Sequence, residues 1–191
     1  MEEFGGLIGL RVSDLIEIYG FSSKELGIYS YPSSEELDKF KIKSIFLGYF
    51  EKWDSLRNYN KAKEKGFTEY ENLEGCYFNF EKIDNYQHGI HDYFKYLKFG
   101  FGRATDQLCY LVRRGIISRE KAVHKVDELE GKFPVSYMGK STEKILDKIG
   151  LSTTEFKKIC DKFTNKKIFK TDQSGKLVFD EKGNLIKKYS I

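Results

Sequence analysis

A short stretch in the middle of the chain concentrates side chains that could hold a charged ligand. It reads GIHDYFKYLKFGFGRATD, residues 89–106, and combines aromatic rings, lysines, an arginine, a histidine and two aspartates around a G-x-G. A core helix needs the rings but not the charges, and a solvated face needs the charges but not the rings. A site that grips a polar, charged ligand against a rigid wall uses both.

The cationic residues of this stretch fall on one face of a predicted helix, because His91, Lys95 and Lys98 are spaced by four and three residues. The opposite face is apolar and is expected to lie in the core: Ile90, Phe94 and Leu97. The helix would therefore present a cationic stripe while its back is anchored.

Two glycines follow, and they favour a bend that lets the backbone approach a ligand. Gly100 and Gly102 precede Arg103, and the next helix begins near Thr105 or Asp106. An arginine just before a helix N-terminus can hold a phosphate or a carboxylate, helped by backbone N–H groups and the helix dipole. Asp106 would oppose a bound anion and suits a sugar hydroxyl, an amine or a metal better. A solvated basic face with an ordinary first-turn carboxylate is the alternative, and spacing alone leaves both open.

Other catalytic signatures are missing from the sequence. His88, His91 and Asp92 lack the spacing of a zinc protease, no C-x-x-C pair occurs, and there is no Walker loop or nucleophile elbow. No metal-ligating residue is therefore predicted.

Composition gives broad limits for a chain of 191 residues with a net charge of +4. The charge is too small and too interleaved with acidic residues for a typical nucleic-acid binder, so no nucleic acid is expected. No apolar run approaches the ~18 residues of a membrane span, and the first residues do not read as a signal peptide, so no membrane and a cytoplasmic location are expected. Cys109 and Cys160 fall at apolar helical positions and are expected to be buried, reduced thiols.

The amino-terminal third follows a helix–strand–helix pattern. A helix ends at Gly20, Ser33 and Glu36 form a capping box, and residues 42–50 read as a strand buried on both faces. Trp53 follows at the carboxyl end of that strand, where open α/β sheets bind ligands. This order of elements is typical of α/β domains, but the other strands of the sheet must come from another part of the protein.

From residue 89 onward the periodicity is helical. Helices are predicted around 89–99, after 105 to a stop at Gly115, at 119–130, around 145–149 and at 153–163. The tail repeats D-x-x-G-x-L, which predicts a small β-meander at 168–188.

The ordered series of motifs closely resembles the carboxyl-terminal half of the N-acetyl sugar amidotransferases. These are lipopolysaccharide and flagellin-glycan enzymes of the PP-loop ATP pyrophosphatase superfamily. The resemblance rests on GIHDYFKYLKFGFGRATDQLCYLVRRGIISREKA, EGKFPVSYMGK, EFKKICDKFTNKKIFKTD and GKLVFDEKGNL. RVSDLIEIYG and IKSIFLGYF are similar to the later part of the ATP-binding domain.

The resemblance implies a fold and a division of the chain. It implies the late portion of a Rossmann-like PP-loop α/β domain at residues 1–74, followed by a mainly α-helical domain with the β-meander at residues 75–191. The superfamily's S-G-G-x-D-S pyrophosphate loop does not occur in the sequence. An internal start, as in a split gene, a truncated frame or a cloned fragment, is therefore expected, with no activity of the chain alone.

The resemblance also implies a reaction and its partners. ATP, with Mg²⁺, activates the acetamido oxygen of a sugar as an adenylate, and ammonia displaces AMP to leave an acetamidino group. The substrate is an N-acetylated sugar, of the pseudaminic type or another, or a sugar nucleotide. Glutaminase and cyclase-like subunits supply the ammonia. ATP is expected to be bound mainly by the amino-terminal half of the family, which carries the pyrophosphate loop that this sequence lacks.

The candidate site residues follow from the two lines of reasoning together. The catalytic candidates are Arg103 for an anion, Asp106 for a sugar hydroxyl or the incoming amine, and Lys95 or Lys98 for developing negative charge. The substrate-binding candidates are His91, Asp92, Gly100, Gly102, Thr105 and Trp53. A non-catalytic module that binds a partner subunit or RNA, or that only assembles the enzyme, remains the alternative.

Overall fold

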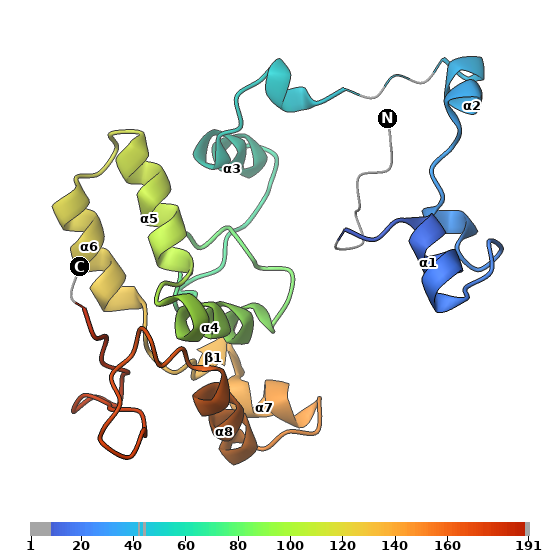
Figure 1. Cartoon of the computed structure of the whole chain (residues 1–191). Coiled ribbons are helices and arrows are strands. Elements are labelled where there is room, and N and C mark those ends of the chain that lie inside the picture. Colours follow the sequence, from blue (N-terminus) through green and yellow to red (C-terminus); the bar gives the residue numbers. More distant parts are fainter. Residues whose placement is uncertain (1–8, 42, 44, 190–191) are drawn as a thin grey trace. The chain divides into compact units, whose positions relative to one another are not determined.

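A computed structural model describes residues 9–41, 43 and 45–189 of the chain. The chain forms two compact units, Met1–Ser55 and Leu56–Ile191 (Figure 1). The predicted domain boundary at residue 74 remains a prediction, and the two units are described one at a time.

The first unit consists of short helices. They are α1 (Val12–Tyr19), the 3-10 helix η1 (Gly27–Tyr29), α2 (Ser34–Lys39) and the 3-10 helix η2 (Leu47–Tyr49). Gly20 ends α1 in the left-handed conformation at φ 73°, as predicted. The predicted capping box also forms, with the Ser33 side chain accepting from the Glu36 N–H.

The predicted strand at residues 42–50 is wrong for its described part. Ile42 lies outside the described residues, and Leu47–Tyr49 form η2. The backbone bonds here are local: Tyr49 N–H donates to Phe46 C=O at 3.0 Å, and Glu51 N–H donates to Leu47 C=O at 2.9 Å. A buried strand requires neighbours that take its N–H and C=O groups, and no described residue provides such a neighbour, so the chain closes its bonds on itself.

The second unit is built mainly from helices. Its elements are α3 (Ser55–Lys63), α4 (His88–Phe99), α5 (Arg103–Arg113), α6 (Arg119–Leu129), β1 (Ser136–Tyr137), β2 (Lys140–Ser141), α7 (Thr142–Asp147) and α8 (Thr153–Phe163). Figure 1 shows α5 beside α6 and α7 beside α8, with α4 close to the middle of this unit. The only strands that the structure describes are β1 and β2. They form an antiparallel pair in which Ser136 lies opposite Ser141 and Tyr137 lies opposite Lys140.

The helix ends follow local signals in the sequence. Ser118 and Ser152 cap α6 and α8, each accepting from an N–H three residues on. Gly100 ends α4 in the left-handed conformation at φ 77°, where an added Cβ would lie 2.9 Å from Ile168 Cγ2. These ends fix the short link Gly100–Gly102 that joins α4 to α5.

Three hydrophobic clusters hold this unit together. The first joins α4 to α7, α8 and the tail, and its buried members are Tyr96, Leu97, Leu146, Phe156, Cys160, Phe169 and Leu185. The second joins α5 to α6 around Phe78, Ala104, Leu108, Leu111 and Ala122. The third contains Leu73, Cys76, Tyr137 and Ile145. Because α4 supplies Leu97 to the first cluster and packs Ile90 against the third, it is the element around which the others are arranged.

The tail adopts a meander held by isolated bridges. Phe169 pairs with Lys187, Thr171 with Leu177 and Phe179 with Leu185, all antiparallel. Asp172 and Asp180 begin the two turns and accept backbone N–H groups.

The described residues are therefore mainly helical, with one small antiparallel sheet. None of the helices in the described ranges combines the length and the hydrophobicity that crossing a bilayer requires. The prediction for Cys160 is confirmed, because its thiol is buried, but the prediction for Cys109 is wrong. Cys109 is exposed because the buried face of α5 runs through Ala104, Leu108 and Leu111.

Candidate functional site

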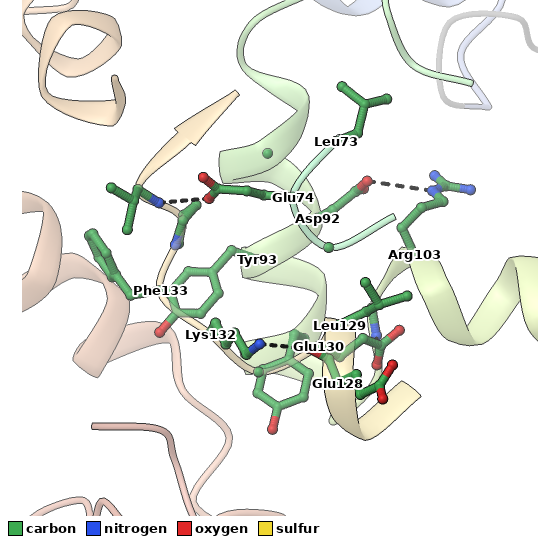
Figure 2. A pocket seen from close by; sticks show the side chains of 17 residues that line it. Leu73, Glu74, Asp92, Tyr93, Arg103, Glu128, Leu129, Glu130, Lys132 and Phe133 are labelled. Atoms are coloured by element: carbon green, nitrogen blue, oxygen red, sulfur yellow. Dashed lines mark hydrogen bonds and ion pairs between the residues drawn. The ribbon is translucent and has the colours of Figure 1, made fainter. Parts of the chain in front are cut away.

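A cavity of about 330 Å³ opens beside the start of α4 and α5 (Figure 2). Its lining residues come from the loop before α4, from α4, from the start of α5 and from the segment 128–135: Leu73, Glu74, Gly75, Gly89, Asp92, Tyr93, Tyr96, Gly102, Arg103, Glu128, Leu129, Glu130, Gly131, Lys132, Phe133, Pro134 and Val135. This volume lies at the lower end of the range for small-molecule sites.

Aromatic rings form one wall of the cavity. The rings of Tyr93 and Phe133 meet edge to face, with centroids 5.7 Å apart. Burial raises the pKa of the Tyr93 phenol, and burial also raises the pKa of Tyr96 to about 12. Both phenols are therefore neutral hydrogen-bond donors throughout the physiological range.

Charged groups also line the cavity. Figure 2 shows Arg103 directed at Asp92, and Arg103 Nε lies 3.4 Å from Asp92 Oδ2. Asp92 is 8% exposed, and its other oxygen lies 3.7 Å from Lys82 Nζ. Arg103 also approaches Asp106, with 3.5 Å between Nη1 and Oδ2. Arg103 is thus shared by two carboxylates of its own fold, and it still lines the cavity.

Glu130 occupies the position at which the sequence predicts an anionic ligand. Its carboxylate accepts from the N–H groups of Gly102 at 2.8 Å and Thr105 at 2.6 Å, and from Thr105 Oγ1 at 3.0 Å. The start of α5 is therefore capped by a side chain from the end of α6. A side chain at Gly102 would crowd this contact, because an added Cβ would lie 3.1 Å from Glu130 Cδ.

A second carboxylate fastens the far end of the 130–136 segment. Glu74 accepts from Val135 N–H at 2.8 Å, from Ser136 N–H at 3.0 Å and from Ser136 Oγ at 2.7 Å. The segment is therefore held at both ends by carboxylates, and the cavity lies along it.

Lys132 is a cation of the cavity that makes no direct ion pair with a carboxylate of the described residues, although the pKa of the Glu128 carboxyl is lowered chiefly by its hydrogen bond with Lys125 and also by the charge of Lys132. Lys132 Nζ donates to the backbone C=O of Glu128 at 2.6 Å (Figure 2), and the residue is exposed. Since a carbonyl offers only a dipole to an ammonium group, a hydroxyl, carbonyl or phosphate oxygen of a ligand can also bind it.

The predicted cationic stripe of α4 divides between two surroundings. Lys95 pairs with Asp106 and lies 4.6 Å from the centre of the Phe101 ring. Lys98 lies 5.0 Å from the centre of the Phe163 ring, on α8. Of the four predicted catalytic residues, Lys95, Arg103 and Asp106 are brought together and Lys98 is not.

The predicted substrate-binding residues divide in a similar way. Asp92 and Gly102 line the cavity, and Thr105 lines a neighbouring one. His91 is exposed and bonded to Asp92, and Gly100 is buried as the end of α4. Trp53 belongs to the first unit and is exposed there.

The neighbouring cavity is a wider groove of about 710 Å³ along α5 and α6. Its lining combines apolar side chains, among them Leu108, Val112 and Val126, with charged ones such as Arg113 and Arg119. Tyr96, Glu130, Gly131 and Lys132 line both cavities. The two cavities therefore adjoin at the start of the 130–136 segment.

The described residues show no ready-made cluster of side chains for the metal ion of a nucleotide triphosphate. No group of three or more His, Cys, Asp and Glu among them could hold a metal. Of the backbone donors at the start of α5 that could hold a phosphate, the N–H groups of Gly102 and Thr105 are taken by Glu130.

Sequence reasoning missed Glu74, Glu130 and Lys132 as residues that shape the cavity. Glu130 and Lys132 lie in the EGKFP stretch, which was used for the resemblance but not for the site. Glu74 carries no local signal, because its partners lie 61 and 62 residues further along the chain.

Two comparisons with known proteins complete the description. The family model "LPS biosynthesis protein WbpG-like, C-terminal domain" matches residues 64–182, well over half of the chain. No curated protein matched the sequence.

Proposed function

Because the chain belongs to the family of LPS biosynthesis proteins with a WbpG-like C-terminal domain, we propose that it provides the sugar-binding part of an amidotransferase. The predicted kinship with the carboxyl-terminal half of such proteins is confirmed at the level of that family. The finer proposal is an ATP-dependent enzyme that converts the acetamido group of an N-acetylated sugar or sugar nucleotide into an acetamidino group.

The observation that carries the proposal is the cavity itself. Every residue that lines it lies within the matched residues 64–182. Its wall of Tyr93 and Phe133 can contact the C–H face of a sugar ring, and Arg103 and Lys132 can donate to hydroxyl or acetyl oxygens. An apolar wall with a few converging polar groups is the usual composition of a small-molecule site.

Other parts of the reaction are assigned outside this unit. We propose that ATP and Mg²⁺ are bound mainly elsewhere in the enzyme, by a PP-loop domain of which residues 1–74 are a late portion. Glutaminase and cyclase-like subunits would supply the ammonia, and the enzyme would work in the cytoplasm. The chain alone is then expected to be inactive.

The reaction itself is the direct test. The chain is incubated with ATP, Mg²⁺, ammonium chloride and UDP- or CMP-linked N-acetyl sugars, alone and with a separately produced PP-loop domain. Mass spectrometry should detect the acetamidino sugar, with one AMP per product, in the mixture only. If no tested sugar is converted in the mixture, the proposal is wrong.

A matched pair of lysines tests the cavity. Lys132→Ala removes the cavity's exposed cation, and Lys125→Ala removes a cation that pairs with Glu128 on the same helix end. Lys132→Ala is expected to raise the KM for the sugar at least about tenfold, the size of one charge-assisted bond. Lys125→Ala should leave the KM unchanged, and equal effects would contradict the assignment.

A further inference from the structure

The three histidines of the chain each contact a carboxylate, but the three carboxylates differ in burial. His88 Nε2 lies 3.0 Å from Asp84, whose side chain is 83% exposed, and His124 Nδ1 lies 3.2 Å from Glu128, which is 45% exposed. His91 Nδ1 lies 2.9 Å from Asp92, which is 9% exposed. His91 is the only one of the three that is bonded to a buried carboxylate.

Asp92 is held from three sides. Its Oδ1 lies 2.9 Å from His91 Nδ1 and 3.7 Å from Lys82 Nζ, and its Oδ2 faces Arg103 Nε at 3.4 Å. The groups come from the loop before α4, from α4 and from α5. Two cations therefore contact the carboxylate and fix it in position.

A fixed carboxylate sets the tautomer of the imidazole. Because an ionised carboxylate can only accept, the neutral ring must carry its proton on Nδ1 and leave a lone pair on Nε2. The His91 side chain is 67% exposed and is bonded to Asp92 through Nδ1, so its ring is accessible to a reacting group. The remaining charged neighbours are Lys95 and Asp106, which pair with each other.

We propose that His91 and Asp92 form a proton-transfer dyad, in which His91 is the general base for ammonia addition and Asp92 is its positioning residue. This inference rests on the proposed function. Asp92 lines the sugar cavity and His91 is bonded to it, so a bound sugar whose acetamido arm reaches past Asp92 would meet His91.

The proposed step is balanced. The nitrogen of ammonia forms a bond to the activated acetamido carbon and becomes positively charged. His91 Nε2 takes one proton from it, the bond from that carbon to the activated oxygen breaks, and AMP leaves with the electron pair. The neutral amidine remains, and the imidazolium returns its proton to the product or to water.

The first test measures the tautomer in the full-length chain, independently of activity. Long-range ¹H–¹⁵N correlation spectra should show His91 as the Nδ1–H form when neutral, and Asp92→Asn should abolish that preference. Glu128→Gln should change His124 much less, because Glu128 is exposed. His91 in the Nε2–H form, or in the same mixture as His124, would overturn the dyad.

The second test separates proton transfer from structure in the assay of the whole enzyme. His91→Gln should lower acetamidino formation by about 100-fold or more. It should leave sugar-dependent ATP–pyrophosphate exchange unchanged, and added imidazole should partly restore His91→Ala. His124→Gln is the matched control at an exposed histidine, and it should change neither acetamidino formation nor ATP–pyrophosphate exchange. The proposal would be contradicted if His91→Gln lost both ATP–pyrophosphate exchange and acetamidino formation, or if it kept full activity.

Failure of the proposed function gives a different result. If the enzyme without substitutions forms no acetamidino sugar, the proposed function is overturned. The hydrogen-bonded pair of His91 and Asp92 is then tested only by the NMR measurement of the His91 tautomer.

Discussion

Glu130 reaches from the end of α6 to three hydrogen-bond donors of the start of α5. Removing its charge leaves buried N–H groups with a weaker acceptor, so Glu130→Gln is expected to lower the free energy of unfolding by about 1–2 kcal/mol. Urea denaturation measures the loss. Glu128→Gln is the control, because Glu128 is exposed and pairs with Lys125 at the surface. Equal midpoints for both variants would show that Glu130 does not cap α5.

The cysteines are expected to differ in reactivity because only the thiolate is nucleophilic. Burial raises the pKa of Cys76 to about 11 and the pKa of Cys160 to about 12, whereas Cys109 is exposed. Iodoacetamide at pH 8 should therefore modify Cys109 in the folded protein, and the other two only after unfolding. Mass spectrometry of the peptides identifies the sites, and rapid labelling of Cys76 in the folded state would contradict its burial.

The same two thiols make stability depend on alkaline pH. Because their pKa values in the folded state exceed the unfolded value of 9.0, the folded state binds more protons above pH 9. Their contribution is fully present below pH 9 and is lost as the pH rises through about 11 and 12. Cys76→Ala should flatten the fall in the free energy of unfolding between pH 9 and 11. An unchanged slope would assign the fall to other groups.

Among the elements, the segment 130–136 between α6 and β1 has the tightest fit. Gly131 has φ 84°, and an added Cβ would lie 2.7 Å from Tyr96 Oη. Gly115 has a similar φ of 68° but open space around it. Replacing either glycine by alanine costs about 1 kcal/mol, because alanine disfavours this left-handed backbone conformation.

Gly131→Ala must in addition displace Tyr96, so its melting temperature should fall further than that of Gly115→Ala. Sugar binding should weaken only in the Gly131 variant, because Gly131 lines the cavity and Gly115 does not. Equal losses of stability in the two variants would show that the segment 130–136 accommodates the added methyl group without a further loss of stability.

The elements also show which features the sequence could predict. The ends of α6 and α8 could be predicted because a cap depends on residues three apart, such as Ser152 and Glu155. The strand at 42–50 could not, since an apolar run indicates burial but does not supply a neighbouring strand. The bend before Arg103 was predicted, but the acceptor that fills it, Glu130, lies 25 and 28 residues away from its partners.

At the scale of the whole molecule, the three hydrophobic clusters all lie in the second unit. Residues 55–191 are therefore expected to fold without the first unit, with a cooperative transition within a few degrees of that of the full chain. Calorimetry of the two proteins measures this. A truncated chain that exposes its core or melts without cooperativity would show that the first unit completes the fold.

The central claim is that the cavity between α4, α5 and the segment 130–136 binds an N-acetylated sugar. Titrating the ¹⁵N-labelled chain with UDP-N-acetylglucosamine and following its amide resonances tests this claim most directly. The account predicts the largest shifts at Glu74, Tyr93, Arg103 and residues 130–135. Saturating ligand without any shift there, or shifts confined to the first unit, would contradict it.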